Sequence, residues 1–172
     1  MASIMETLLD VLDEELSQYR ELLALSNEKT RIVIENDVEA LIQLTDREQV
    51  MVDALAATGK RRQIAMKDVA DVMNKKADSF RLTDLIELLS ARPAEQKRLA
   101  GITDQLREVA ESMRLVNEQN RELIQSALDM VEFDLNLVRG MKAAPETAQY
   151  NSGGYTAGNR LGVPNGKFDA KQ

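Results

Sequence analysis

The residues of this sequence that stand out chemically are two amides in an apolar helical pattern. The stretch VNEQNRELIQSAL, residues 116–128, places Asn117 and Asn120 three positions apart among Leu, Val and Glu. Asparagine is a weak helix former because its amide competes with the backbone for hydrogen bonds. Amides at such positions therefore indicate a use in packing or in binding.

Composition argues against catalysis and metal chemistry. The 172-residue chain contains no His and no Cys. It therefore lacks the usual ligands of zinc, copper and haem, and the commonest general base. An all-carboxylate magnesium site or catalytic pair stays formally open, but the 29 acidic side chains are typical of solvated helix surfaces. We expect no enzymatic activity, no metal and no cofactor.

The same composition bears on where the protein works. The start, MASIMETLLDVLDEEL, is acidic rather than basic, so we expect no signal peptide. No apolar run approaches the ~20 residues of a membrane span. Absence of Cys rules out disulfides and is typical of cytosolic proteins. We expect a soluble, cytoplasmic protein without membrane insertion, and the net charge of −7 argues against general nucleic-acid binding.

Charge and glycine divide the chain into two segments. Residues 1–139 hold 18 basic and 27 acidic side chains, whereas residues 140–172 hold 4 and 2, together with six of the eight glycines. The sequence predicts a helical bundle over 1–140 and a flexible, Gly-rich tail over 141–172. Tyr150 and Tyr155 are large anchors that such a tail can order on a partner.

The first helix is expected to start at a capping box formed by Ser3 and Glu6 and to stop at Asn36-Asp37. Its side chains follow one another at alternating spacings of three and four, as one helical face does. That face comprises Met5, Leu8, Leu12, Leu16, Tyr19, Leu23, Ser26, Thr30 and Val33.

A second helix is expected from Val38 to about Lys76, with a break near Gly59, because glycine costs ~1 kcal/mol in a helix interior. The predicted stripe is Val38, Leu41, Thr45, Val52 and Leu55, resuming in a shifted phase at Ala65, Val69, Val72 and Met73. The basic cluster that follows Gly59 has two interpretations. It is either a solvated turn that balances acidic neighbours, which we favour, or a nucleic-acid contact that lacks a stacking platform. Its members are Lys60, Arg61 and Arg62.

Thr83-Asp84 is expected to cap a short helix over 85–89, and Pro93 to open a last helix that ends at Arg139, before Gly140. Its predicted seam is Leu99, Ile102, Leu106, Val109, Met113, Val116, Asn120, Leu123 and Ala127. Beyond Leu123 the stripe slips by about one residue, to Ile124, Leu128, Val131, Leu135 and Val138.

The seam gives Asn120 two interpretations. A single polar Asn in an apolar seam fixes register and partner orientation at some loss of stability, and the residues favour this reading. Alternatively, Asn117 and Asn120 bond the backbone of a partner or of the tail. Long amphipathic helices joined by short turns pack as bundles. The fold class expected is therefore all-α: an elongated antiparallel bundle or coiled-coil hairpin of three long helices plus a short one, with a flexible C-terminal tail.

Over about residues 5–160 the sequence resembles the FlgN family of flagellar export chaperones. The resemblance is carried by ENDVEALIQL around the first turn, LTDLIELLS before the last helix, VNEQNRELIQSALDMV within it, and Tyr150 in the tail. It implies a cytoplasmic chaperone of the flagellar type III secretion system. Such a protein binds hook-associated proteins of the hook–filament junction, keeps them from assembling early and delivers them to the export gate and ATPase.

The resemblance gives weight to Asn117, Asn120, Leu123 and Ile124 as client-binding residues. From the residues themselves we add Leu128 and Val131 of the slipped stripe and Tyr150 and Tyr155 of the tail as hypothetical client contacts. We expect a monomer or weak dimer. The main alternative is a generic coiled-coil structural or adaptor protein without an export client, which would self-associate instead. A nucleic-acid-binding regulator would show steeply salt-dependent binding.

Overall fold

A computed structural model describes residues 2–143. They fall into a compact unit that ends at Phe133 and a second unit that starts at Asp134, of which residues 134–143 are described and helical. The predicted all-α class is confirmed, with three long helices, one short helix and no strand among the described residues. The helices are α1 (Ala2–Glu35), α2 (Val38–Val72), α3 (Leu82–Leu88) and α4 (Pro93–Ala143), with 3₁₀ turns η1 (Ala77–Ser79) and η2 (Leu89–Ala91).

The turn between α1 and α2 forms where it was expected. Asn36 has a φ of 57°, a left-handed conformation that Asn tolerates better than most residues. Asp37 is the N-cap of α2, and its carboxylate accepts a hydrogen bond from the Ala40 backbone N–H at 2.9 Å. This tight connection reverses the chain. At the other end, Ser3 lies inside α1 rather than before it, so the predicted capping box does not mark its start.

The expected break at Gly59 is wrong, because α2 is continuous from Val38 to Val72. Residues on both sides of the glycine are held by α1: Thr58 is buried against it, and Arg61 pairs with Glu14 at 2.9 Å. These contacts offset the ~1 kcal/mol helix penalty of glycine. The helix also ends four residues before Lys76.

Two further boundaries differ from expectation. Helix α3 begins at Leu82 rather than Leu85, because the Asp84 carboxylate accepts from the Arg81 backbone N–H at 2.9 Å and so completes the first turn. Helix α4 opens at Pro93 as predicted but runs through Gly140 to Ala143. Good helix formers follow that glycine, so it does not terminate the helix.

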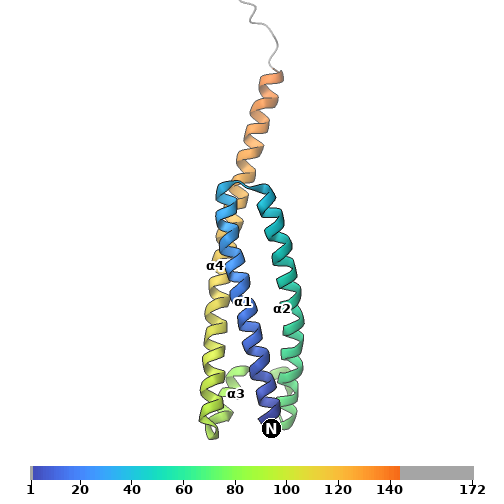
Figure 1. Ribbon diagram of the computed structural model, residues 1–172, viewed down its shortest axis with the longest axis vertical. Coiled ribbons are helices and arrows are strands. Elements are labelled where there is room, and N and C mark those ends of the chain that lie inside the picture. Colours follow the sequence, from blue (N-terminus) through green and yellow to red (C-terminus); the bar gives the residue numbers. More distant parts are fainter. Residues whose placement is uncertain (1, 144–172) are drawn as a thin grey trace, which may run out of the picture. The chain divides into compact units, whose positions relative to one another are not determined.

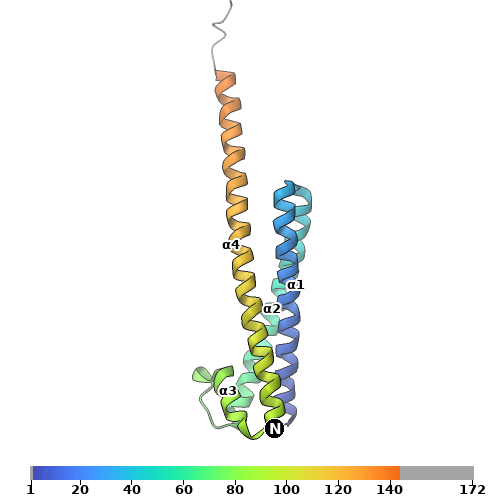
Figure 2. The same ribbon diagram turned by 90° about the vertical axis from the view of Figure 1, so that its left-hand side faces the viewer.

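Within residues 2–133, α1 packs against both other long helices (Figures 1 and 2). Against α2 it is antiparallel, because Glu14 pairs with Arg61 while Glu28 pairs with Arg47. Against α4 it is parallel, because Asp13 pairs with Arg98 near the start of both helices and Thr30 bonds Asn120 farther along. The predicted faces of α1 and α4 are buried or half-buried along these contacts.

The predicted stripe of α2 is partly wrong, since four of its residues are exposed: Val38, Thr45, Val52 and Val72. The observed face keeps the alternating three- and four-residue spacing, but it includes the polar residues Glu48, Thr58 and Arg62. In full it comprises Leu41, Leu44, Glu48, Met51, Leu55, Thr58, Arg62, Ala65 and Val69.

Apolar burial is uneven along the unit. We call the end that carries α3 the base, and the end that carries the α1–α2 turn the tip (Figure 2). The base core draws on α1, α2, α3, η2 and α4 and comprises Met5, Leu8, Leu9, Leu12, Ala65, Val69, Leu85, Leu89, Leu99 and Ile102. The tip core is far smaller: Leu25, Ile32 and Leu44.

Candidate functional site

The predicted site residues that the structure describes all lie on α4, and they differ in exposure. Asn120 is buried and Asn117 is exposed; Leu123 and Ile124 are half-buried. Leu128 and Val131 are 58% and 53% exposed, respectively. Tyr150 and Tyr155 lie outside the described residues, as does the rest of the segment from residue 144.

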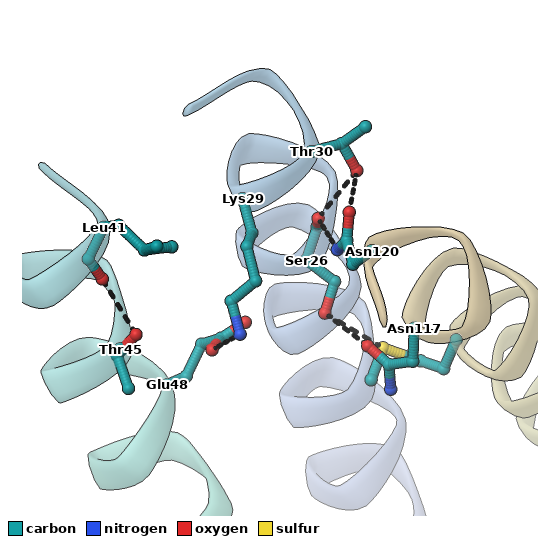
Figure 3. Close-up of polar contacts among 9 residues, drawn as sticks. Ser26, Lys29, Thr30, Leu41, Thr45, Glu48, Asn117 and Asn120 are labelled. Atoms are coloured by element: carbon teal, nitrogen blue, oxygen red, sulfur yellow. Dashed lines mark hydrogen bonds and ion pairs between the residues drawn. The ribbon is translucent and has the colours of Figure 1, made fainter. Parts of the chain in front are cut away.

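Both ends of the Asn120 amide are engaged by α1 (Figure 3). Its Nδ2 donates to the Ser26 backbone carbonyl at 2.8 Å, and its Oδ1 accepts from the Thr30 hydroxyl at 2.6 Å. The amide is therefore satisfied within the chain, as a buried polar group must be. This geometry is what the register interpretation of Asn120 requires.

Asn117 belongs to the same polar cluster but sits at its edge. Its Oδ1 accepts from the buried Ser26 hydroxyl at 3.3 Å, and that hydroxyl also lies 4.0 Å from the Met113 sulfur. The cluster joins α1 to α4 (Figure 3). A contact of Asn117 with a client stays a prediction.

A second set of polar contacts joins α1 to α2. Lys29 forms an ion pair with Glu48, and Arg62 pairs with Glu15 at 3.0 Å. Burial raises the pKa of the Glu15 carboxyl, and the Arg62 guanidinium opposes that rise without cancelling it. Together with Arg61, which pairs with Glu14, two cations of the basic cluster are thus held by α1. The cluster lies on a continuous helix and not in a turn.

Above these contacts an apolar groove opens at the tip, which we call the tip groove. It has a volume of about 260 Å³ and lies between the α1–α2 connection and α4. Ile124, Leu128 and Val131 form its α4 wall, so the structure brings three predicted site residues together. The opposite wall and floor comprise Ile32, Val33, Asn36, Asp37, Val38 and Leu41, with Ala127 on α4.

One acidic residue, Asp37, lines the groove, and further carboxylates are sequence neighbours of the lining residues. Glu35 and Glu39 flank the α1–α2 turn and are exposed. Asp129 and Glu132, also exposed, flank the groove residues of α4. One nearby cation, Arg31, lies 3.8 Å from Glu35 and is engaged by it. The groove thus combines mainly apolar lining residues with exposed acidic sequence neighbours, which we call its acidic border.

Sequence reasoning missed the α1–α2 wall of this groove. Val38 was assigned to a buried stripe, yet it follows the N-cap Asp37 directly and is exposed at the helix end. A large apolar side chain next to a tight turn is a usable signal, because the first turn of a helix has no neighbouring turn to cover it.

Two other kinds of site are absent from residues 2–143. No group of three or more acidic side chains there is placed to hold a metal ion. No helix in that range combines the length and the apolar character needed to cross a bilayer. The tip groove is the candidate site because three of the predicted site residues line it.

One comparison with known proteins is informative. The sequence model of a family described as FlgN protein matches residues 1–158, which include the tip groove and both tail tyrosines. No curated protein and no solved structure matches the chain.

Proposed function

Because the chain belongs to the FlgN family of flagellar export chaperones, we propose that it binds hook-associated proteins of the hook–filament junction in the cytoplasm. On this proposal it prevents their premature self-assembly and delivers them to the export gate and ATPase. The proposed activity is binding, without an enzymatic step or a cofactor.

The tip groove carries the proposal. Subunits that assemble through terminal amphipathic helices expose an apolar stripe before assembly. A helix-in-groove contact covers such a stripe with apolar anchors spaced three to four residues apart. Leu128 and Val131 present that spacing on α4 and are exposed in the free chain. A client helix laid along them inserts its side chains between α4 and the α1–α2 turn.

The acidic border adds selectivity. An approaching helix with Lys or Arg beside its apolar stripe is attracted by Glu35, Glu39, Asp129 and Glu132, whereas an acidic helix is repelled. Such rim charges change association rates and partner choice more than final affinity. The proposed client segment is therefore apolar with basic flanks.

The required affinity is modest, because the client must be released for export. A micromolar Kd corresponds to about 8 kcal/mol. A few buried apolar side chains at ~1.5–3 kcal/mol each, less the loss of freedom on association, supply a free energy of that order.

The competing function is a coiled-coil structural or adaptor protein. It is favoured by the exposed apolar residues of α4, which a second copy can also cover. Analytical ultracentrifugation separates the two functions: the chaperone stays a monomer or weak dimer and forms a complex with client. The adaptor self-associates and ignores the client.

The direct test replaces groove residues without touching the core. Leu128→Asp and Val131→Asp are expected to weaken binding of a purified hook-associated protein at least tenfold in calorimetric titration, about 1.4 kcal/mol. Leu115→Asp is the matched control: it lies on the same helix, is 55% exposed and does not line the groove. Its affinity should stay within about twofold of the unmodified chain. Equal effects at Leu115 and Leu128 would remove the groove from the proposal.

A further inference from the structure

Positive charge gathers in one segment of this acidic chain. Residues 60–81 contain seven basic and three acidic side chains, a balance of +4. Since the whole chain carries −7, the remaining residues carry −11. The concentration of cations is therefore local, and it covers the end of α2 and the connection to α3.

Part of this segment forms an open groove at the base, which we call the basic groove. It lies between α2 and the η1–α3 connection and has a volume of about 680 Å³. Its cations are Arg62, Lys67 and Arg81, and none of the described residues lining it is acidic. The remaining lining residues are Gln63, Met66, Ala77, Phe80, Leu82 and Thr83.

Two of the three cations are available to a ligand. Arg62 is held by Glu15, but Lys67 and Arg81 are exposed, and no ion pair of either side chain occurs among the described residues. The nearest partner on α3, Asp84, bonds the Arg81 backbone N–H rather than its guanidinium.

The floor of the basic groove is apolar and fixed. Met66, Phe80 and Leu82 are half-buried and pack against the base core, so their positions are set by the best-packed part of the unit. A ligand that uses the whole groove must combine carboxylates with at least one apolar side chain.

We propose that the basic groove docks an acidic, amphipathic peptide segment of a partner protein. Its carboxylates pair with Lys67 and Arg81, and an apolar side chain packs on Phe80. Nucleic acid fits less well, because the chain has a net charge of −7 and would repel a polyanion. The groove also has only one aromatic side chain, the half-buried Phe80, on which a base could stack. The groove lies at the opposite end of the unit from the tip groove. The two sites therefore do not exclude each other, and this one does not depend on the proposed function.

The first experiment uses the full chain and a fluorescein-labelled peptide, Glu-Glu-Leu-Phe-Glu-Glu-Leu-Leu-Glu-Glu, followed by fluorescence anisotropy. The double variant Lys67→Glu/Arg81→Glu is expected to bind at least tenfold more weakly at low salt. The matched control Lys97→Glu/Arg107→Glu makes the same charge change on exposed positions of α4 and should stay within twofold. An unchanged affinity in the first variant, or an equal loss in the control, overturns the proposal.

A second pair of measurements separates docking from bulk attraction. Replacing Leu and Phe of the peptide by Ser should remove most of the binding, because the apolar floor then has no ligand. A single-stranded DNA oligonucleotide should not compete. Retained binding of the Ser peptide, or displacement by the oligonucleotide, assigns the groove to unspecific or nucleic-acid attraction and overturns the proposal. Circular dichroism checks folding, and Lys67→Gln/Arg81→Gln replaces the charge-reversed variant if that one unfolds.

Discussion

At the base of the bundle, four helices and a 3₁₀ turn bury ten apolar side chains in one core, whereas at the tip three buried apolar side chains come from α1 and α2 alone. Further buried apolar side chains, among them Leu16, Leu22 and Val109, lie between the two cores, and polar contacts join the helices there and at the tip. Asn120 bonds Thr30 and Ser26, Arg62 pairs with Glu15, and Lys29 pairs with Glu48.

This difference bears on where a partner can enter. A buried leucine contributes ~1.5–3 kcal/mol by removal from water, whereas a hydrogen bond within the chain contributes ~0.5–1.5 kcal/mol net. Local opening requires least free energy where few apolar contacts must be broken. The base therefore fixes the arrangement of the helices, and the tip is the end that opens at the smaller cost in free energy.

The largest effect is expected from a cavity in the base. Leu12→Ala should lower the free energy of unfolding by about 4 kcal/mol, because its neighbours in the five-element core cannot collapse onto the space. Leu44→Ala, equally buried but in the small tip core, should lose only about 2 kcal/mol, since the sparse surroundings relax. Urea denaturation followed by circular dichroism measures both. A loss at Leu44 as large as at Leu12 would remove the contrast between the two ends.

Removal of the segment beyond α4 is expected to change binding and not stability. A chain truncated after Ala143 lacks Tyr150 and Tyr155, the proposed client anchors. Its melting temperature should stay the same while its affinity for a hook-associated client falls at least tenfold, about 1.4 kcal/mol. Calorimetry and thermal denaturation on one preparation decide this. Undiminished affinity would exclude the tyrosines from the site, and a large loss of stability would mean that the segment packs on the bundle.

Asn120→Leu is expected to stabilise the bundle by about 1 kcal/mol, because the seam gains apolar packing. The substitution leaves the Thr30 hydroxyl with a hydrogen-bond acceptor, because this hydroxyl already lies 3.2 Å from the Ser26 backbone carbonyl oxygen and can donate to it. The variant should also show a mixed oligomeric state in light scattering, since the register determinant is gone. A clear destabilisation of a still monomeric variant would show that the amide bonds are essential.

The smallest effect is expected at Glu15, and it depends on pH. Burial raises its pKa in the folded state, so the folded chain binds a proton more readily than the unfolded chain. The stability contributed by protonated Glu15 is present below the ordinary glutamate pKa and is lost as the pH rises through the raised value. Glu15→Gln should therefore have a slightly higher melting temperature than the unmodified chain at pH 7, and the gain should vanish in acid. Melting curves between pH 4 and 7 measure it. A gain that is the same at both ends of this range would contradict the assignment to Glu15.

Sequence reasoning located the helices and two of the three packed faces. Two packed faces could be predicted because apolar residues dominate them: the face of α1 through Leu8 and Leu12, and the face of α4 through Leu99 and Asn120. The face of α2 could not, because Glu48, Thr58 and Arg62 occupy positions on it and exposed valines lie off it. Hydrophobic periodicity cannot show that a polar residue lies on a packed face, because this depends on its partner on another helix.

The same limit holds for the candidate site. Ile124, Leu128 and Val131 could be predicted because the apolar stripe on α4 continues past Asn120. Two other features depend on contacts between segments far apart in the chain. One is that these residues line the same groove as Val38 and Leu41, and the other is that Lys67 and Arg81 line the basic groove together.

The sequence alone determined the packed faces of α1 and α4 and the positions of the Asn36-Asp37 turn and of the start at Pro93, since helical periodicity and capping are local properties of the chain. Tertiary structure decided how the helices pair: α1 runs parallel to α4, Glu14 and Glu15 hold the arginines that follow Gly59, and the amide of Asn120 is satisfied by Ser26 and Thr30. The reason is that a polar side chain at an interface is stable only when its partner is in place, and partners 47 to 94 residues away leave no mark on local periodicity.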